Sequence, residues 1–104
     1  MKKVPTYDLE EIKELLKKEE TRIITRRDRL EAVRLGYADA DEMVKRVLKL
    51  VPSEFHKTMC SDKIPNLMHD VYYTDDRCRT LYIKLQIQFN GKDWKGVIIS
   101  FKEK

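Results

Sequence analysis

Lys102 stands in an unusual setting for a charged residue near the end of a chain, directly after the apolar run Val97–Phe101 (VIISF). Residues near a chain terminus are usually polar and frayed unless packing holds them in place. An apolar run at this point predicts a strand that anchors Phe101 in the core. Lys102 would then present its charge from a fixed position, which is what stabilisation of a phosphate group requires.

The segment Leu81–Phe89 (LYIKLQIQF) carries two further candidates, Tyr82 and Lys84, because its apolar and polar residues alternate. A period of two is typical of a strand that buries one face. The turn signal at residues 90–91 (NG) predicts an antiparallel hairpin with the apolar run described above. If the odd-numbered residues of that run face the core, Lys102 shares an open face with Tyr82 and Lys84.

The first half of the chain predicts three helices, each preceded by a capping residue. Asp8, Thr25 and Asp39 stand at N-cap positions, and an acidic residue follows each of them three positions later. Apolar residues then recur at helical spacing, and they are Leu9, Ile12, Leu15 and Leu16, then Leu30, Ala32 and Val33, then Met43, Val44, Val47 and Leu48.

Short β-branched or alternating segments supply the remaining strands. Residues 22–25 (RIIT) predict an edge strand between the first two helices, and Phe55–Cys60 and Met68–Tyr73 predict two more. Helices that are segregated from an antiparallel sheet define an α+β domain, and we expect residues 1–104 to form a single one.

The composition favours a folded protein with an anionic partner. The chain has a net charge of +4 and 41% hydrophobic residues, which is too apolar for a disordered protein. Arginines gather between residues 22 and 34, either as a basic stripe or as a solvated helix face. No apolar stretch approaches membrane-spanning length, and we expect a soluble, cytoplasmic protein. Cys60 and Cys78 stand alone, which favours free, buried thiols over a metal site or a disulfide.

Several short motifs occur in an order that resembles a known family. In the second half they are FHKTM at 55–59, DVY at 70–72, LYIKL at 81–85 and SFKEK at 100–104. Upstream they are IKELLK at 12–17, Ile-Thr at 24–25 and Leu-Gly at 35–36, so the similarity covers nearly the whole chain. The sequence resembles the MqsR family of bacterial toxins, within the RelE-like set of small endoribonucleases.

This resemblance implies a fold, a reaction and a partner. The fold is RelE-like, with N-terminal helices packed on a C-terminal antiparallel sheet. The reaction is cleavage of single-stranded mRNA without a metal or cofactor, in which the ribose 2′-hydroxyl attacks the adjacent phosphorus, and it inhibits translation and growth. The partner is an antitoxin of the MqsA type that binds zinc and DNA, so both of those functions belong to the antitoxin. The ribosome is a further candidate partner.

The resemblance carries four catalytic positions onto this sequence, Lys57, His69, Tyr82 and Lys102. At His69 the family has a glutamine that follows a tryptophan, whereas this chain has Met68-His69. His69 could act as an acid or base, or could replace the hydrogen bonds of the amide as a neutral imidazole. The lysines would neutralise the phosphate and move protons, and Tyr82 would contact the leaving group or a base.

Lys57 raises a problem of parity, because it alternates in phase with Phe55 and Met59, which read as core residues. A β-bulge, or a strand near the sheet edge from which the lysine reaches solvent, would resolve the conflict. His56 stands next to Lys57 and could join His69 in a two-histidine site. We favour a solvated or locally hydrogen-bonded His56.

RNA binding has three further candidates, Lys84, Arg77 and Arg79. Acidic neighbours partly offset the two arginines, so a solvated turn is the other interpretation of that segment. Trp94 is either an exposed stacking residue or a cover for the hairpin end. A non-catalytic RNA- or ribosome-binding module that uses the same sheet face is the alternative function, and a scaffold for a protein partner is a third.

Overall fold

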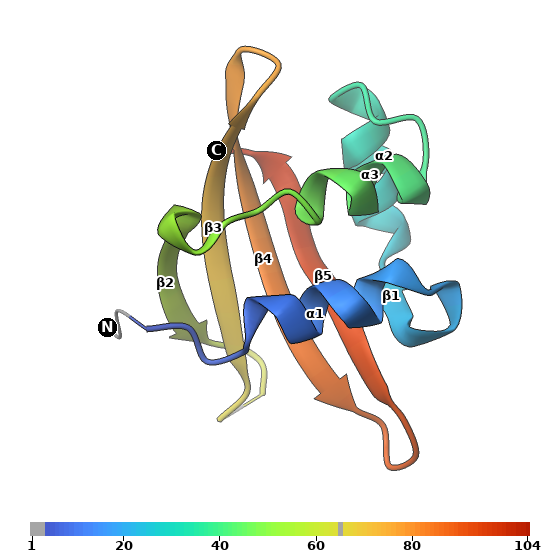
Figure 1. Ribbon diagram of the computed structural model, residues 1–104, viewed down its shortest axis with the longest axis vertical. Coiled ribbons are helices and arrows are strands. Elements are labelled where there is room, and N and C mark those ends of the chain that lie inside the picture. The colour runs from blue at the N-terminus through green and yellow to red at the C-terminus, as the bar shows by residue number, and fades with distance from the viewer. Residues whose placement is uncertain (1–3, 65) are drawn as a thin grey trace.

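The computed structural model describes residues 4–64 and 66–104, which form a β-sheet with a layer of helices on one face (Figure 1). Its longer elements, in chain order, are α1 (Leu9–Lys17), β1 (Arg22–Ile24), α2 (Arg26–Arg34), α3 (Ala40–Val47), β2 (Phe55–Cys60), β3 (Met68–Asp76), β4 (Arg79–Phe89) and β5 (Trp94–Glu103). Short 3-10 turns at Glu19–Thr21 and Pro52–Glu54 precede β1 and β2. This arrangement confirms the predicted α+β fold class.

The strand order in the sheet is β1-β5-β4-β3-β2, so β1 and β2 form its edges. β1 pairs with β5 in parallel, as an edge strand where one was predicted, and all other neighbours are antiparallel. β3 and β4 extend beyond their predicted ends to a tight two-residue turn. Arg77 and Cys78 form this turn with φ angles of 53° and 65°, which is the backbone of a type I′ hairpin without its usual asparagine and glycine.

Buried apolar side chains fill the space between the helices and one face of the sheet. The cluster contains Leu9, Ile12, Leu16, Ala32, Tyr37, Met43, Val44, Val47, Leu50, Tyr72, Leu81, Ile83, Leu85, Ile98 and Phe101. α1 lies especially close to β5, because Gly96 has no side chain. A Cβ atom at Gly96 would lie 2.9 Å from Leu15 Cβ and 3.2 Å from the carbonyl oxygen of Ile12.

The helices begin where the capping pattern predicts. The side chains of Asp8, Thr25 and Asp39 each accept a hydrogen bond from a backbone amide in the first turn of α1, α2 and α3. Each cap satisfies one of the amides that a helix start leaves without an intrahelical partner. The predicted helix starts are therefore confirmed.

The predicted apolar stripe of α2 is wrong for two of its three residues, Leu30 and Val33. Leu30 and Val33 are 55% and 53% exposed, whereas Asp28 and Ala32 are buried. Residues four apart lie on one side of a helix. The side of α2 that carries Asp28 and Ala32 therefore faces the interior of the protein. Asp28 is accommodated there because the Thr25 hydroxyl donates to its carboxylate at 2.7 Å.

Both cysteines are free but exposed, so the prediction of buried thiols is wrong. Cys78 is exposed because it occupies the tight turn between β3 and β4, and Cys60 ends the edge strand β2. Among the described residues, no helix is long and apolar enough to cross a membrane.

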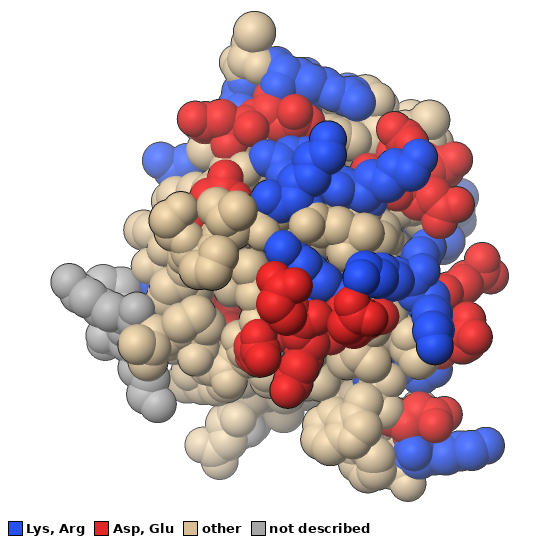
Figure 2. All heavy atoms as spheres, in the orientation of Figure 1, with Lys and Arg blue, Asp and Glu red and all other residues tan. Residues whose placement is uncertain are grey.

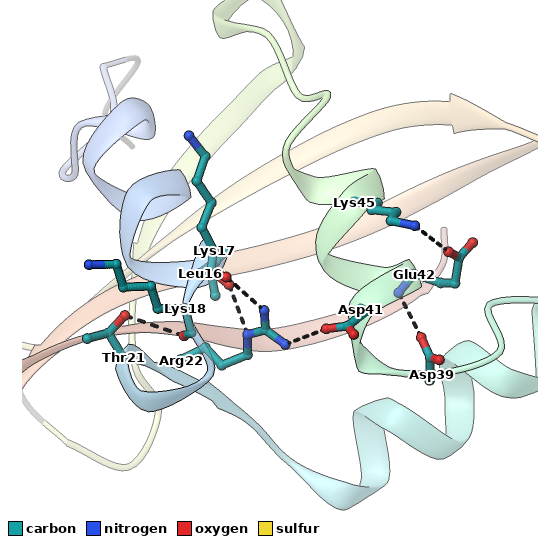
Figure 3. A network of polar contacts seen from close by, with 9 residues as sticks. All are labelled: Leu16, Lys17, Lys18, Thr21, Arg22, Asp39, Asp41, Glu42 and Lys45. Atoms are coloured by element: carbon teal, nitrogen blue, oxygen red, sulfur yellow. Dashed lines mark hydrogen bonds and ion pairs between the residues drawn. The ribbon is translucent and has the colours of Figure 1, made fainter.

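Arg22 joins the end of α1 to the start of α3 (Figure 3). Its Nε donates to the carbonyl of Leu16 at 2.9 Å, and its Nη2 donates to the carbonyl of Lys17 at 3.2 Å. Its Nη1 donates to Asp41 at 3.0 Å. The side chain of Arg22 is only 11% exposed, while that of Asp41 is 76% exposed. Arg22 therefore caps a helix end from a sheltered position, and the ion pair is the exposed part of the network.

Replacing Arg22 with alanine should lower the free energy of unfolding by about 2 kcal/mol, because charged hydrogen bonds to two helix-end carbonyls are lost. Asp41→Ala is the matched control and should cost less than about 1 kcal/mol, since an exposed ion pair contributes little. Urea unfolding monitored by circular dichroism measures both values. Equal losses in the two variants would show that the ion pair, and not the cap, is what stabilises this junction.

Candidate active site

The sheet face that points away from the helices carries the candidate residues. In the described part of the chain, the helices lie on the near side of the sheet in Figure 1, and the far side is left open. β2 contributes Lys57 and β3 contributes His69. β4 contributes Tyr82 and Lys84, and β5 contributes Lys102. We call this surface the open face. Four neighbouring strands therefore contribute to one candidate site.

Tyr82 lies at the centre of the site. It pairs directly with Lys102 on β5 and with Tyr73 on β3. The Nζ atoms of Lys102 and Lys84 lie 5.0 Å and 5.7 Å from the centroid of the Tyr82 ring. Within the described residues, neither lysine forms an ion pair, so the ring is flanked by positive charges that no carboxylate neutralises. An anionic group placed beside the Tyr82 hydroxyl would meet both of them.

A β-bulge in β5 sets the orientation of Lys102. Lys84 pairs with Ser100 but Leu85 pairs with Ile98, so one extra residue lies between them on β5. As a result Phe101 and Ile98 both belong to the core, although their numbers differ in parity. The prediction that the odd-numbered residues all face the core is therefore wrong. Lys102 nevertheless lies on the same face as Tyr82 and Lys84, because it follows Phe101 beyond the bulge.

A second bulge resolves the parity of Lys57. The register of β2 against β3 shifts between Phe55 and Lys57, so that Phe55 pairs with Tyr72 and Lys57 pairs with Val71. Phe55 packs against the core cluster, while Lys57 follows Val71 onto the open face. The structure therefore has the bulge, in a strand that also forms an edge of the sheet.

His69 is the second residue of β3 and is almost inaccessible, with 9% of its surface exposed. It pairs with Met59 on β2, and its Nδ1 atom is buried without a hydrogen-bond partner among the described residues. Burial lowers the pKa of His69, and the positive charge of Lys84 lowers it further. The imidazole is therefore neutral at pH 7, and its low exposure limits direct contact with a ligand.

Three residues extend the site beyond the predicted set. The His56 ring stacks on the Tyr73 ring with 4.1 Å between their centroids. The centroids of the Tyr73 and Tyr82 rings are 5.9 Å apart. Lys104 places its Nζ 4.8 Å from the centre of the Tyr73 ring. His56 was expected to be solvated or locally hydrogen-bonded, and it is exposed but stacked on Tyr73. The sequence signal that could have found Tyr73 was its spacing of four from His69 on the predicted strand Met68–Tyr73, which places both side chains on one face.

Arg77 and Arg79 are not brought to this site. Arg77 donates to the carbonyl of Gly36 at 2.6 Å and stacks its guanidinium 4.3 Å from the centroid of the Tyr37 ring. Arg79 donates to the carbonyl of Leu35 at 2.5 Å. Both arginines therefore connect the turn between β3 and β4 to the end of α2.

The face that carries the helices has both acidic and basic side chains on its surface (Figure 2). Carboxylates gather over α1 in Figure 2, where Glu10, Glu11 and Glu14 are exposed, and lysine and arginine side chains surround them. Trp94 lines a groove with these residues and packs on Phe89, with 4.8 Å between the ring centroids. Among the described residues, no cluster of three or more histidine, cysteine, aspartate or glutamate side chains could hold a metal ion.

The lowered pKa of His69 predicts a pH dependence of stability. In the unfolded chain the imidazole binds a proton near its ordinary pKa of 6.5, and in the folded protein it binds one only at lower pH. The free energy of unfolding should therefore fall as pH decreases from 7.5 to 5.5, with a slope from this residue of at most about 1.4 kcal/mol per pH unit.

Urea unfolding across this pH range tests the assignment. His69→Gln should flatten the slope, because glutamine does not titrate. His56→Gln is the matched control and should keep the slope of the unmodified protein. If His69→Gln retains the full slope, then a group other than His69 is responsible for it.

Comparison with known proteins places the chain in a family. No curated protein sequence matches it. The sequence model of the family described as "Motility quorum-sensing regulator, toxin of MqsA" matches residues 4–103, which is nearly the whole chain. The match agrees with the resemblance carried by the motifs around Lys57, Tyr82 and Lys102, and with the α+β fold. The chain belongs to the MqsR family of toxins.

Proposed function

We propose that this toxin is an endoribonuclease that cleaves mRNA by attack of the ribose 2′-hydroxyl on the adjacent phosphorus, without a metal ion. The main support is the position of Tyr82 between Lys84 and Lys102 on the open face. Such cleavage leaves a 2′,3′-cyclic phosphate and a free 5′-hydroxyl. It therefore needs a proton acceptor at the 2′-oxygen, cations at the phosphate and a proton donor at the 5′-oxygen.

Lys102 and Lys84 are suited to the phosphate. Both ammonium groups lie within 6 Å of the same ring centroid, at 5.0 Å and 5.7 Å, so a phosphate at the Tyr82 hydroxyl would be held from two sides. Lys102 is anchored because its neighbour Phe101 is buried in the core. A charge whose position is fixed before the reaction does not have to be reorganised in the transition state.

Tyr82 and Lys57 are the proposed proton carriers. The phenol of Tyr82 can donate a proton to the departing 5′-oxygen. Lys57 lies on the same open face, on the edge strand β2, where it pairs with Val71 of β3. We assign His69 a positioning role, because it is 9% exposed and lies beside Lys84. A neutral imidazole there adds no positive charge that would repel the lysine.

The biological consequence of this proposal is growth inhibition that an antitoxin relieves. Cleavage of mRNA in the cytoplasm stops translation, and a partner of the MqsA type that carries zinc and DNA binding would neutralise the toxin. The helix-covered face carries the exposed carboxylates of Glu10, Glu11 and Glu14 on α1, with basic side chains around them (Figure 2). We propose that residues 1–104 act as one functional domain.

A non-catalytic RNA- or ribosome-binding module is the second candidate function. It is favoured by the ring contacts of Tyr73 and Tyr82, because aromatic rings and lysines on a sheet also bind single-stranded RNA without cleaving it. The two candidates differ in whether the Tyr82 hydroxyl is required. A binding surface needs only the ring, whereas the reaction needs the proton.

Tyr82→Phe should reduce cleavage of a long unstructured mRNA by about 10²–10⁴-fold, because the ring stays while the proton donor is lost. Lys102→Ala should reduce it by at least about a hundredfold while leaving much of the RNA affinity. Gel analysis in EDTA measures cleavage, and a substrate with 2′-deoxyribose at the cleaved nucleotide should resist it. Lys92→Ala, in the exposed β4–β5 turn, is the matched control.

Two outcomes would contradict this proposal. If the unmodified protein leaves mRNA intact in EDTA both with and without ribosomes, the enzyme assignment fails. If Tyr82→Phe retains full RNA cleavage, the reaction is real but Tyr82 is not its proton donor.

A further inference from the structure

The aromatic contacts of the open face continue from Tyr82 toward the sheet edge. Tyr73 lies next to Tyr82, and His56 stacks on the far side of Tyr73 with an interplanar angle of 19°. His56 is exposed and Tyr73 is half-buried, so a flat ligand can reach this pair from solvent. The pair lies on the strands that neighbour the proposed reaction site.

A notch in the sheet edge adjoins these rings. β2 begins at Phe55, opposite Tyr72, so Tyr73–Asp76 of β3 extend past the end of their neighbour. The resulting cavity has a volume of about 380 Å³, and its lining includes Ser53, Glu54, His56, Tyr73, Asp75 and Thr80. This volume is within the range of small-ligand sites, and the cavity opens beside the stacked pair.

We propose that the stacked pair His56–Tyr73 and this notch form a subsite for one nucleobase of the RNA, next to the phosphate held at Tyr82. The inference rests on the proposed function, because it needs single-stranded RNA on the open face. Bases of single-stranded RNA can be splayed out of their own stack, and proteins bind them by stacking on aromatic rings. Lys104, 4.8 Å from the Tyr73 ring centre, supplies a cation for the backbone at this subsite.

The polar groups of the notch favour a base that donates hydrogen bonds. One oxygen of Asp75 accepts a bond from the Thr80 hydroxyl at 2.7 Å, and in the described structure the other oxygen has no partner. Glu54 is occupied, because it accepts bonds from Thr74 and from the amide of Val51. Asp75 is therefore the acceptor available to an exocyclic amine. Adenine, cytosine and guanine have such an amine and uracil lacks one.

Binding of a non-cleavable oligonucleotide tests the subsite separately from the reaction. A 2′-O-methyl oligoribonucleotide of roughly ten residues has no attacking hydroxyl, and its affinity can be measured by fluorescence anisotropy. His56→Ala and Tyr73→Ala should each weaken binding about tenfold. His56→Phe should retain binding, because it keeps a ring. Trp94→Ala is the matched control, since it removes an exposed aromatic from the helix-covered face, and it should leave affinity unchanged.

Base preference tests the role of Asp75. The unmodified protein should bind oligoadenylate and oligocytidylate more tightly than oligouridylate, all as 2′-O-methyl decamers. Asp75→Asn should narrow that difference, because an amide offers the amine a weaker acceptor. Thermal melts of each variant establish that it is folded.

The two proposals fail in distinguishable ways. If the unmodified protein cleaves RNA but His56→Ala and Tyr73→Ala bind the decamer as tightly as it does, the subsite is overturned and the reaction stands. If binding depends on His56 while no RNA is cleaved, the subsite stands and the reaction is overturned.

Discussion

The pairing of β4 with β5 is the constraint on which the rest of this structure depends. β4 is the central strand of the sheet and β5 lies beside it, and together they bury Ile83 and Phe101 on one side and present Tyr82 and Lys102 on the other. The same backbone hydrogen bonds therefore hold the core together and fix the separation of the charged groups. Since the side chains of paired residues project to the same face, the ring of Tyr82 and the ammonium group of Lys102 are brought together by the ladder itself.

The helices contribute to the site indirectly. They supply the apolar cover that makes one face of the sheet an interior, and Gly96 allows α1 to lie close against β5. Because that face is filled, Lys57, Lys84 and Lys102 project from the other one. The open face thus has lysines at strand positions that the core does not use.

Much of the fold was predictable from local patterns, and the site only in part. Helix starts at Asp8, Thr25 and Asp39 follow from side-chain capping, which is a local interaction. A turn near Arg77 was predicted, but its two-residue length was not, because Arg77 and Cys78 adopt positive φ angles without being the residues that normally signal them. Bulges depend on how two strands meet, so a period of two along one strand cannot locate them.

The two bulges also affect how relatives of this protein should be compared. A bulge adds a residue to one strand without changing the length of its partner strand. Two members of the family can therefore differ by one residue in the length of β2 or β5 and still present the same side chains on the open face. An alignment that forbids a gap inside β2 or β5 would then match Lys57 or Lys102 with core residues of a relative. Correspondence across the family is therefore better established from the partner strands, β3 and β4, whose mutual pairing runs without a shift from Asp70 to Asp76.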